Sequence, residues 1–314
     1  TQKILEEVAA AGYDLNEFKV IVGRGGLVKP ISSGVWGVNA AMIEDLKKGV
    51  SGEHACNLGG LIANDIASSL NNVPAIIADP VVVDEMEPLA RISGHPLFPR
   101  RSIFHALNQK AIARKYAKDH NQKYEDLNLI IVHLGGGVSV GVHKKGLVID
   151  VNQALDGEGP FSPERTGSLP VNEVVNACFS GQYTKEQIKK MIVGNGGFVA
   201  YLGTNDAYTV EVKAKEGSEE HAFIQSAMAY QVAKEIGAAA TVLLIVITCG
   251  IVFAGILGNY LQDDILPSAA EYESTVSDLE QTSFVYYVNK KGEIEVAQRL
   301  YTTVDRQWAE YDEI

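Results

Sequence analysis

The chain of 314 residues is long enough for two domains, and 46% hydrophobic with 21% charged residues is the balance of a folded protein. Its formal charge of −12, from 27 basic and 39 acidic residues, repels a phosphate backbone, so we expect no nucleic-acid partner. Three widely spaced cysteines without a CxxC pair predict neither a disulfide framework nor a zinc site.

The N-terminal third of the chain alternates apolar runs with segments of helical spacing. Residues 18–22 and 75–78 are short apolar runs bounded by Gly, Asn or Pro, which predicts strands. Helices are predicted at residues 1–11, 38–46, 59–70 and 102–117. The chain begins within the first of these, so we expect further sequence upstream. Five of the ten prolines lie between residues 74 and 99, which predicts a rigid loop there. The pattern is that of an α/β protein.

An antiparallel meander is predicted next, with strands at residues 129–134, 138–143 and 147–151. Three consecutive glycines, Gly135, Gly136 and Gly137, separate the first two strands. A Rossmann or Walker motif would be followed by a helix, so the strand-forming VSVGV after the glycines excludes both. Two interpretations of the turn stay open. In one, its backbone N–H groups bind an anion; in the other, it is an ordinary hairpin with left-handed glycines.

Residues 236–262 contain no charged side chain. As a helix they would extend roughly 40 Å, enough to cross a hydrocarbon layer about 30 Å thick. We therefore predict a transmembrane helix at residues 242–261, followed by an acidic juxtamembrane segment at 262–314. The alternative is a buried helix followed by a buried strand, because Gly250, Gly255 and Gly258 interrupt the run.

A polar loop rich in Gly and Pro follows the meander at residues 150–170, and long loops of this kind are usually functional. The joined motif at residues 133–170, HLGGGVSVG followed by ALDGEGPFSPERTGSLP, resembles the acetate and butyrate kinase family, and most closely its butyrate kinases. The resemblance extends from residue 1 to about residue 241. It includes VGRGGLVKP at 22–30, ADPVVVDE at 78–85 and RRSIFHALNQK at 100–110.

The resemblance implies the two-domain fold of actin and the sugar kinases, with a five-stranded sheet of ribonuclease H type in each half. We expect the remainder of the first kinase domain at residues 1–127 and part of the second at 128–241. The fold is truncated at both ends, because two family segments have no counterpart. These are a first phosphate loop before Thr1 and an adenosine motif, Thr-Gly-Gly-Ile, soon after Thr241.

The activity implied by the resemblance is transfer of the γ-phosphoryl group of ATP, with Mg²⁺, to a short-chain carboxylate. Butyrate and ATP would give butanoyl phosphate and ADP, in a cytoplasmic homo-oligomer. A carboxylate is already ionised at neutral pH, so the nucleophile needs no general base. Catalysis then depends on cations aimed at the transferred group.

The resemblance also assigns residues to this chemistry. Arg24 matches the substrate-side arginine and Arg165 the arginine that stabilises the transferred group. Asp79 matches an aspartate that places the metal ion or an arginine, and His105 a histidine that hydrogen-bonds the phosphoryl oxygens. A turn role before Pro80 competes for Asp79, and Asp84 is a nearby substitute. The second phosphate-binding loop corresponds to His133, Gly135, Gly136, Gly137 and Ser139.

Beyond residue 242 the chain is similar to a different family. The run LLIVITCGIVFAGILGNYL and the segment after it look like the N-terminal membrane anchor of a class A penicillin-binding protein. The similarity stops before any glycosyltransferase or transpeptidase residue. Two functions therefore stay open: an active carboxylate kinase, or an inactive kinase fragment held at a membrane by this anchor.

Overall fold

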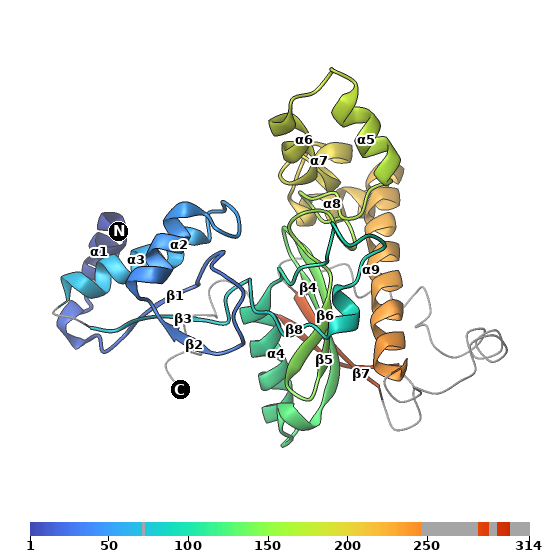
Figure 1. Cartoon of the computed structure of the whole chain (residues 1–314). Helices are drawn as coiled ribbons and strands as arrows, with labels where there is room; N and C mark the ends of the chain where they lie inside the picture. The colour runs from blue at the N-terminus through green and yellow to red at the C-terminus, as the bar shows by residue number, and fades with distance from the viewer. Residues whose placement is uncertain (71–72, 246–281, 289–293, 302–314) are drawn as a thin grey trace. The chain divides into compact units, whose positions relative to one another are not determined.

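The computed structural model describes residues 1–70, 73–245, 282–288 and 294–301. Contacts divide the chain into two compact units (Figure 1). Unit 1 comprises Thr1–Glu85 and Arg101–Lys110, and unit 2 comprises Met86–Arg100 and Ala111–Ile314. Each unit contains both helices and a sheet, which confirms the α/β class.

The described part of unit 1 contains a small mixed sheet in the order β1-β3-β2, rather than the expected five strands. Strand β3 (Ala75–Ala78) pairs in parallel with β1 (Ile21–Gly23) and antiparallel with β2 (Val35–Gly37). The strand expected at 18–22 therefore starts later, at the first residue with a partner on β3. Its neighbour Ile77 is fully buried.

The helices of unit 1 confirm the helical spacing in the sequence. They are α1 (Gln2–Ala10), α2 (Ala40–Lys48) and α3 (Asn57–Ser69). Helix α2 begins after Asn39, whose side chain accepts the N–H of Met42, and ends at Gly49 in the left-handed conformation, with φ 61°. Short 3-10 helices occur across the two units at Leu15–Glu17, Pro88–Arg91 and Tyr124–Asp126.

Unit 2 is built on an antiparallel five-stranded sheet in the order β6-β5-β4-β7-β8. The predicted meander is confirmed as β4 (Asn128–Leu134), β5 (Val138–Lys144) and β6 (Leu147–Val151). Lys145 and Gly146, both with positive φ, form its second turn. The last two strands are β7 (Thr282–Val288) and β8 (Ile294–Tyr301). The expected acidic juxtamembrane segment thus contributes two strands to this sheet.

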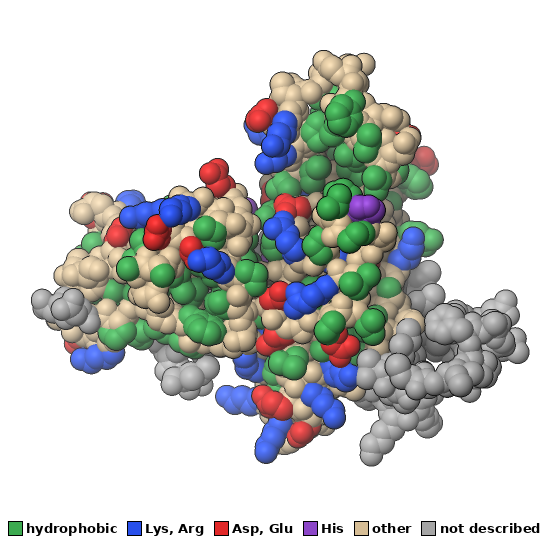
Figure 2. Space-filling view, in the orientation of Figure 1, with side chains coloured by type: hydrophobic (Ala, Val, Ile, Leu, Met, Phe, Trp, Pro, Cys, Tyr) green, Lys and Arg blue, Asp and Glu red, His purple; other side chains and the backbone are tan. Residues whose placement is uncertain are grey.

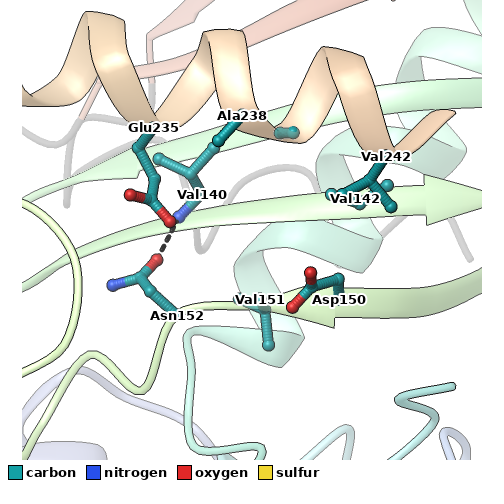
Figure 3. A pocket seen from close by; sticks show the side chains of 9 residues that line it. Val140, Val142, Asp150, Val151, Asn152, Glu235, Ala238 and Val242 are labelled. Atoms are coloured by element: carbon teal, nitrogen blue, oxygen red, sulfur yellow. Dashed lines mark hydrogen bonds between the residues drawn. The ribbon is translucent and has the colours of Figure 1, made fainter. Parts of the chain in front are cut away.

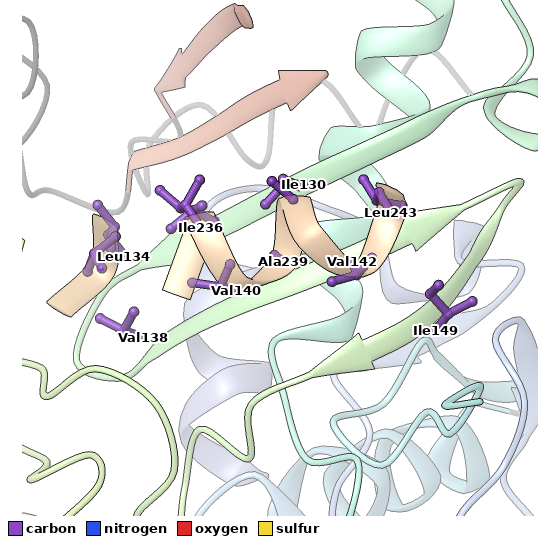
Figure 4. Packing of buried hydrophobic residues seen from close by; sticks show 12 residues of the cluster. Ile130, Leu134, Val138, Val140, Val142, Ile149, Ile236, Ala239 and Leu243 are labelled. Atoms are coloured by element: carbon purple, nitrogen blue, oxygen red, sulfur yellow. The ribbon is translucent and has the colours of Figure 1, made fainter. Parts of the chain in front are cut away.

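Helices cover both faces of β4, because its side chains alternate between two cores. Ile130, Val132 and Leu134 pack with Ile236 and Leu243 of α9 (Glu219–Ile245), as Figure 4 shows for most of this cluster. On the other face, Leu129 and Ile131 pack with residues of α4 (Ala106–Asp119). Strand β4 is therefore buried on both sides.

Four shorter helices complete unit 2: α5 (Val171–Phe179), α6 (Lys185–Ile192), α7 (Gly197–Leu202) and α8 (Ala207–Lys215). Helix α6 begins with a capping box between Thr184 and Gln187. A third core cluster contains Phe161, Phe198, Val210 and Met228, so it joins the long loop after β6 to α7, α8 and α9.

The uncharged run begins inside the protein core. Val242 and Leu243, the first residues of the expected transmembrane helix, belong to α9 and pack in its core cluster, so the predicted start of that helix is wrong. Residues 246–261 of the prediction lie outside the described residues. Among the described helices, none combines the length and the apolar character that a membrane crossing requires.

Candidate functional site

In unit 1, the loop that carries Arg24 is packed tightly on α3. A Cβ at Gly23 would lie 2.4 Å from the carbonyl oxygen of Gly59, and a Cβ at Gly26 would lie 2.5 Å from Cδ2 of Leu46. Neither position tolerates a side chain, so the glycines bring the loop against the helix. Between these buried glycines the Arg24 side chain is exposed. A rigid loop thus presents a guanidinium group to solvent, where it can bind an anion.

Asp79 follows β3 in a strained conformation, with φ 36°, and is 4% exposed. Its Oδ1 accepts hydrogen bonds from the hydroxyl of Ser33 at 2.6 Å and the backbone N–H of Gly34 at 2.8 Å. These contacts organise the loop before β2. They favour the turn role for Asp79, while its metal role stays a prediction.

His105 is half-buried immediately before α4, and its carbonyl accepts the N–H of Gln109. The residues before it are held against the segment after Asp79. Ser102 donates to the carbonyl of Val83 at 2.6 Å, and the N–H of Phe104 donates to Val81 at 3.0 Å. Asp79 and His105 therefore belong to one hydrogen-bonded part of unit 1.

A buried ion pair supports the same part of unit 1. Nζ of Lys110 lies 2.6 Å from Oε2 of Glu85, and these side chains are 1% and 8% exposed. Neither was singled out from the sequence, because both look like ordinary charged residues of a helix and a loop. Buried charges of this kind need a partner, so the pair holds the start of α4, residues 106–110, beside the segment 81–85 within unit 1.

In unit 2, the triple-glycine turn has an unexpected reason for its composition. None of Gly135, Gly136 and Gly137 has a positive φ, so the left-handed hairpin interpretation is wrong. The limit is space. A Cβ at Gly135 would lie 3.0 Å from Nε2 of His133, and one at Gly136 would lie 3.2 Å from Oε1 of Glu164. The anion-binding interpretation of the turn stays open. Ser139, two residues later in β5, is completely buried.

Ser162 joins this turn to the loop that carries Arg165. Ser162 is 1% exposed, and its hydroxyl donates to the carbonyl of Gly136 at 2.6 Å. Its backbone N–H donates to the carbonyl of Arg165 at 3.0 Å. Nη1 of Arg165 in turn donates to the carbonyl of Ala154 at 2.7 Å. The glycine turn and the arginine thus share one rigid connection.

A second glycine-rich segment, Gly194-Asn195-Gly196-Gly197, locks the Arg165 loop from the other side. The N–H groups of Gly194 and Gly196 donate to the carbonyl of Glu164 at 2.7 and 3.4 Å. A Cβ at Gly197, which has φ 58°, would lie 1.6 Å from the carbonyl oxygen of Ser162. Sequence reasoning missed this segment, although three glycines in four residues directly before a helix were the available signal.

Arg100 provides the main electrostatic centre at the other end of the loop. Its Nη1 contacts Asp150 Oδ1 at 2.9 Å and the carbonyl of Ala90 at 2.8 Å, and its Nε lies 3.4 Å from Glu158 Oε2. Burial alone would lower the pKa of Arg100, but the two carboxylates raise the pKa above its ordinary value. Arg100 thus fastens the proline-rich segment to β6, a role that the sequence did not reveal.

Close to Arg100, a pocket of about 40 Å³ opens between α9, β5 and β6 (Figure 3). Glu235 and Asp150 both line it, and burial raises the pKa of Glu235 above its ordinary value. A volume of about 40 Å³ is room for water-sized molecules and too small for a short-chain acid. In the described part of the chain, no three His, Cys, Asp or Glu residues lie together as a metal site.

Comparison with known proteins identifies relatives of this arrangement. A family model described as the acetokinase family matches residues 94–264, more than half of the chain. His105, the glycine turn and Arg165 lie inside this match, whereas Arg24 and Asp79 precede it.

Three solved structures with a similar fold are acetate or propionate kinases. The acetate kinase of Porphyromonas gingivalis has a TM-score of 0.64 at 18% identity, over 77% of this chain and 64% of its own. A propionate kinase from Francisella tularensis subsp. tularensis SCHU S4 has a TM-score of 0.62 at 18% identity, over 79% of this chain and 65% of its own. The acetate kinase of Entamoeba histolytica has a TM-score of 0.59 at 15% identity, over 76% of this chain and 64% of its own. At these identities the likeness shows a shared fold. The chain spans about 64–65% of the length of these structures.

Proposed function

Since the chain belongs to the acetokinase family, we propose that it is a carboxylate kinase that transfers the γ-phosphoryl group of ATP to a short-chain carboxylate. The observation that carries the proposal is the connection in unit 2 through Ser162. It joins a glycine turn suited to phosphate to a loop that bears Arg165. Phosphoryl transfer depends on such fixed donors and cations, because positioning and charge neutralisation provide most of its catalysis.

The residues fit ATP at the glycine turn. A Cβ at Gly135 or Gly136 would crowd the side chain of His133 or Glu164, and without one the backbone of the turn is accessible to a phosphate group. When bound, ATP supplies the phosphoryl group and Mg²⁺ neutralises part of its charge. The guanidinium of Arg165 offers a planar fork of donors to the transferred group, and Arg24 offers the same to the acceptor carboxylate. The acceptor attacks as an anion and needs no base.

Within this activity we propose butyrate as the preferred acceptor, supported by the resemblance of residues 133–170 to butyrate kinases. Acetate and propionate differ from it by one or two methylenes, so discrimination of about 10- to 200-fold per methylene is the most that a pocket supplies. ATP and acyl phosphates are handled in the cytoplasm, where we place the kinase.

A hydroxamate assay of the purified chain with Mg-ATP and each acid tests the proposal. We expect acyl phosphate formation, with the highest kcat/KM for butyrate. Arg165→Ala and Arg24→Ala should each lower kcat about 100-fold or more, because each removes a cation that contacts the reacting groups. Arg114→Ala, which removes an exposed arginine of α4, is the matched control and should keep the activity. Absence of acyl phosphate with every acid would refute the kinase.

A self-associating surface is favoured by the exposed apolar side chains of α5. Val171, Val175 and Phe179 are 75%, 47% and 86% exposed, and no residue of α5 is buried. Hydrophobic groups also lie among polar ones over the helices of unit 2 in Figure 2. We propose that a second copy of the chain covers this helix, since homo-oligomers use self-complementary patches. Phe179→Glu should then shift sedimentation toward the monomer.

The inactive, membrane-anchored fragment remains the second candidate, favoured by the uncharged run up to Gln262. Against it stand the burial of Leu243 in the core and the pairing of β7 with β4. If the anchor dominates, the chain will stay in carbonate-washed membranes and form no acyl phosphate.

A further inference from the structure

Glu164 lies directly beside the glycine turn of unit 2. Its Oε1 is 3.2 Å and its Cδ is 3.4 Å from the position that a Cβ at Gly136 would occupy. The carboxylate is therefore packed against the backbone of the turn. Glu164 belongs to the same loop as Ser162, whose hydroxyl holds the carbonyl of Gly136.

Both ends of Glu164 are fixed. Its carbonyl accepts the N–H groups of Gly194 and Gly196, and its Oε2 accepts a long hydrogen bond of 3.4 Å from Nδ2 of Asn205. Within the described part of the chain, the carboxylate takes part in no ion pair. An uncompensated negative charge is thus held beside the backbone of the glycine turn.

This arrangement disfavours a bare phosphate at the turn, because two like charges would lie within a few ångströms of each other. A phosphate that carries a divalent cation does not meet this repulsion, since the cation provides the opposite charge between them. Mg²⁺ in phosphate sites is typically held by one or two carboxylates together with the substrate's own oxygens. A single carboxylate fits that pattern, and the described residues offer no ready cluster of three metal ligands.

We propose that Glu164 is a specificity-determining residue that makes the glycine turn accept a metal-chelated phosphate and reject a metal-free one. The inference rests on the proposed function, in which this turn binds the phosphates of ATP. The proposed role depends on the charge of Glu164, whereas Ser162 and the glycines determine the shape of the turn.

Calorimetric titration of the full chain with ATP, in Mg²⁺ and in EDTA, tests the proposal without turnover. For the unaltered chain, we expect binding at least tenfold weaker in EDTA. In Glu164→Gln the ratio should fall below threefold, mainly because metal-free ATP binds more tightly. Glu125→Gln is the matched control, since Glu125 packs beside Gly146 in the other turn of the meander. It should keep the ratio of the unaltered chain.

Two further variants separate charge from folding. Glu164→Asp retains the charge and should retain the Mg²⁺ dependence. Asn205→Lys places an ammonium group beside the carboxylate from an exposed position, and should reduce the dependence as Glu164→Gln does. Suppose that ATP binds the unaltered chain, but its affinity still depends on Mg²⁺ in both Glu164→Gln and Asn205→Lys, or in the one of the two that folds. The role of Glu164 is then refuted, while the proposed function stands. If ATP binds in neither buffer, the proposed function fails with it.

Discussion

Gly197 is a residue at which a single added methyl group should have a large effect. Its Cβ would lie 1.6 Å from the Ser162 carbonyl oxygen, so Gly197→Ala must displace the loop that carries Arg165. We expect a loss of about 3 kcal/mol in the free energy of unfolding, from backbone strain and the clash together. Gly203→Ala is the control, because Gly203 has φ 71° but nothing within 4 Å of the added Cβ. Urea unfolding should show a loss of only about 1 kcal/mol for this control.

Glu235 provides a prediction about pH. Burial raises its pKa above the ordinary 4.5, so the folded state favours the protonated form. Its contribution to stability is therefore fully present below pH 4.5 and is lost as the pH rises through the raised folded-state value. Glu235→Gln mimics the protonated form. It should raise the Tm at pH 7.5, and this gain should shrink as the pH falls below 5.

Glu186 is the matched comparison for Glu235, because its pKa is shifted in the opposite direction. It is exposed in the first turn of α6, and backbone hydrogen bonding with help from Thr184 lowers its pKa. Its stabilising effect is present at neutral pH and disappears in acid. Glu186→Gln should therefore lower the Tm at pH 7.5 or leave it unchanged. A gain in Tm for Glu186→Gln equal to that of Glu235→Gln would contradict burial as the cause.

At the scale of elements, the hydrogen bond from Ser162 to Gly136 predicts how the loop and the turn cooperate. Ser162→Ala removes the donor and frees the carbonyl of the turn. We expect the KM for ATP to rise about tenfold, the equivalent of roughly 1.4 kcal/mol, with a smaller change in the KM for the carboxylate. Ser168→Ala is the control, since Ser168 accepts only the N–H of Gly159 within the same loop. Equal increases in both KM values would indicate general loosening instead.

The sequence predicted elements well wherever the pattern was local. Alternation and turn residues located β4, β5 and β6 to within one residue, because a meander pairs neighbours in the chain. The pairing of β7 with β4 joins residues about 150 positions apart, which no local pattern encodes. The uncharged run was similarly ambiguous, since a buried helix over a sheet and a membrane helix have the same composition.

The candidate site followed the same rule. The motif around the glycine turn and Arg165 was recognisable as a short sequence, and its placement in one connected region of unit 2 agrees with that reading. Arg100, the Lys110–Glu85 pair and the Gly194–Gly197 segment were missed, because their partners lie on other elements. A charged side chain gives no sign in the sequence that its counter-ion is 25 or 50 residues away.

At the scale of the whole molecule, the sheet of unit 2 constrains how the chain meets a membrane. Helix α9 (Glu219–Ile245) covers this sheet, and β7 enters the same sheet at Thr282. One crossing of a bilayer between these points would put two parts of a single sheet on opposite sides. Such a sheet cannot form, because its backbone hydrogen bonds require direct contact of the strands. The pairing of β4 with β7 and a single-pass anchor therefore exclude each other.

An engineered disulfide decides between them. Val132 and Phe284 are Cα partners in the β4–β7 pair, so cysteines at both positions should form a disulfide in a chain whose native cysteines are changed to serine. Val132→Cys with Val285→Cys is the matched control. Position 285 is the partner of Ile131, and successive positions of a strand alternate between the two faces of a sheet, so this pair should stay reduced. Mass spectrometry of the oxidised chain measures both. A bond in the first variant requires the two strands to share one side of any membrane, whereas an anchored fragment would give a bond in neither.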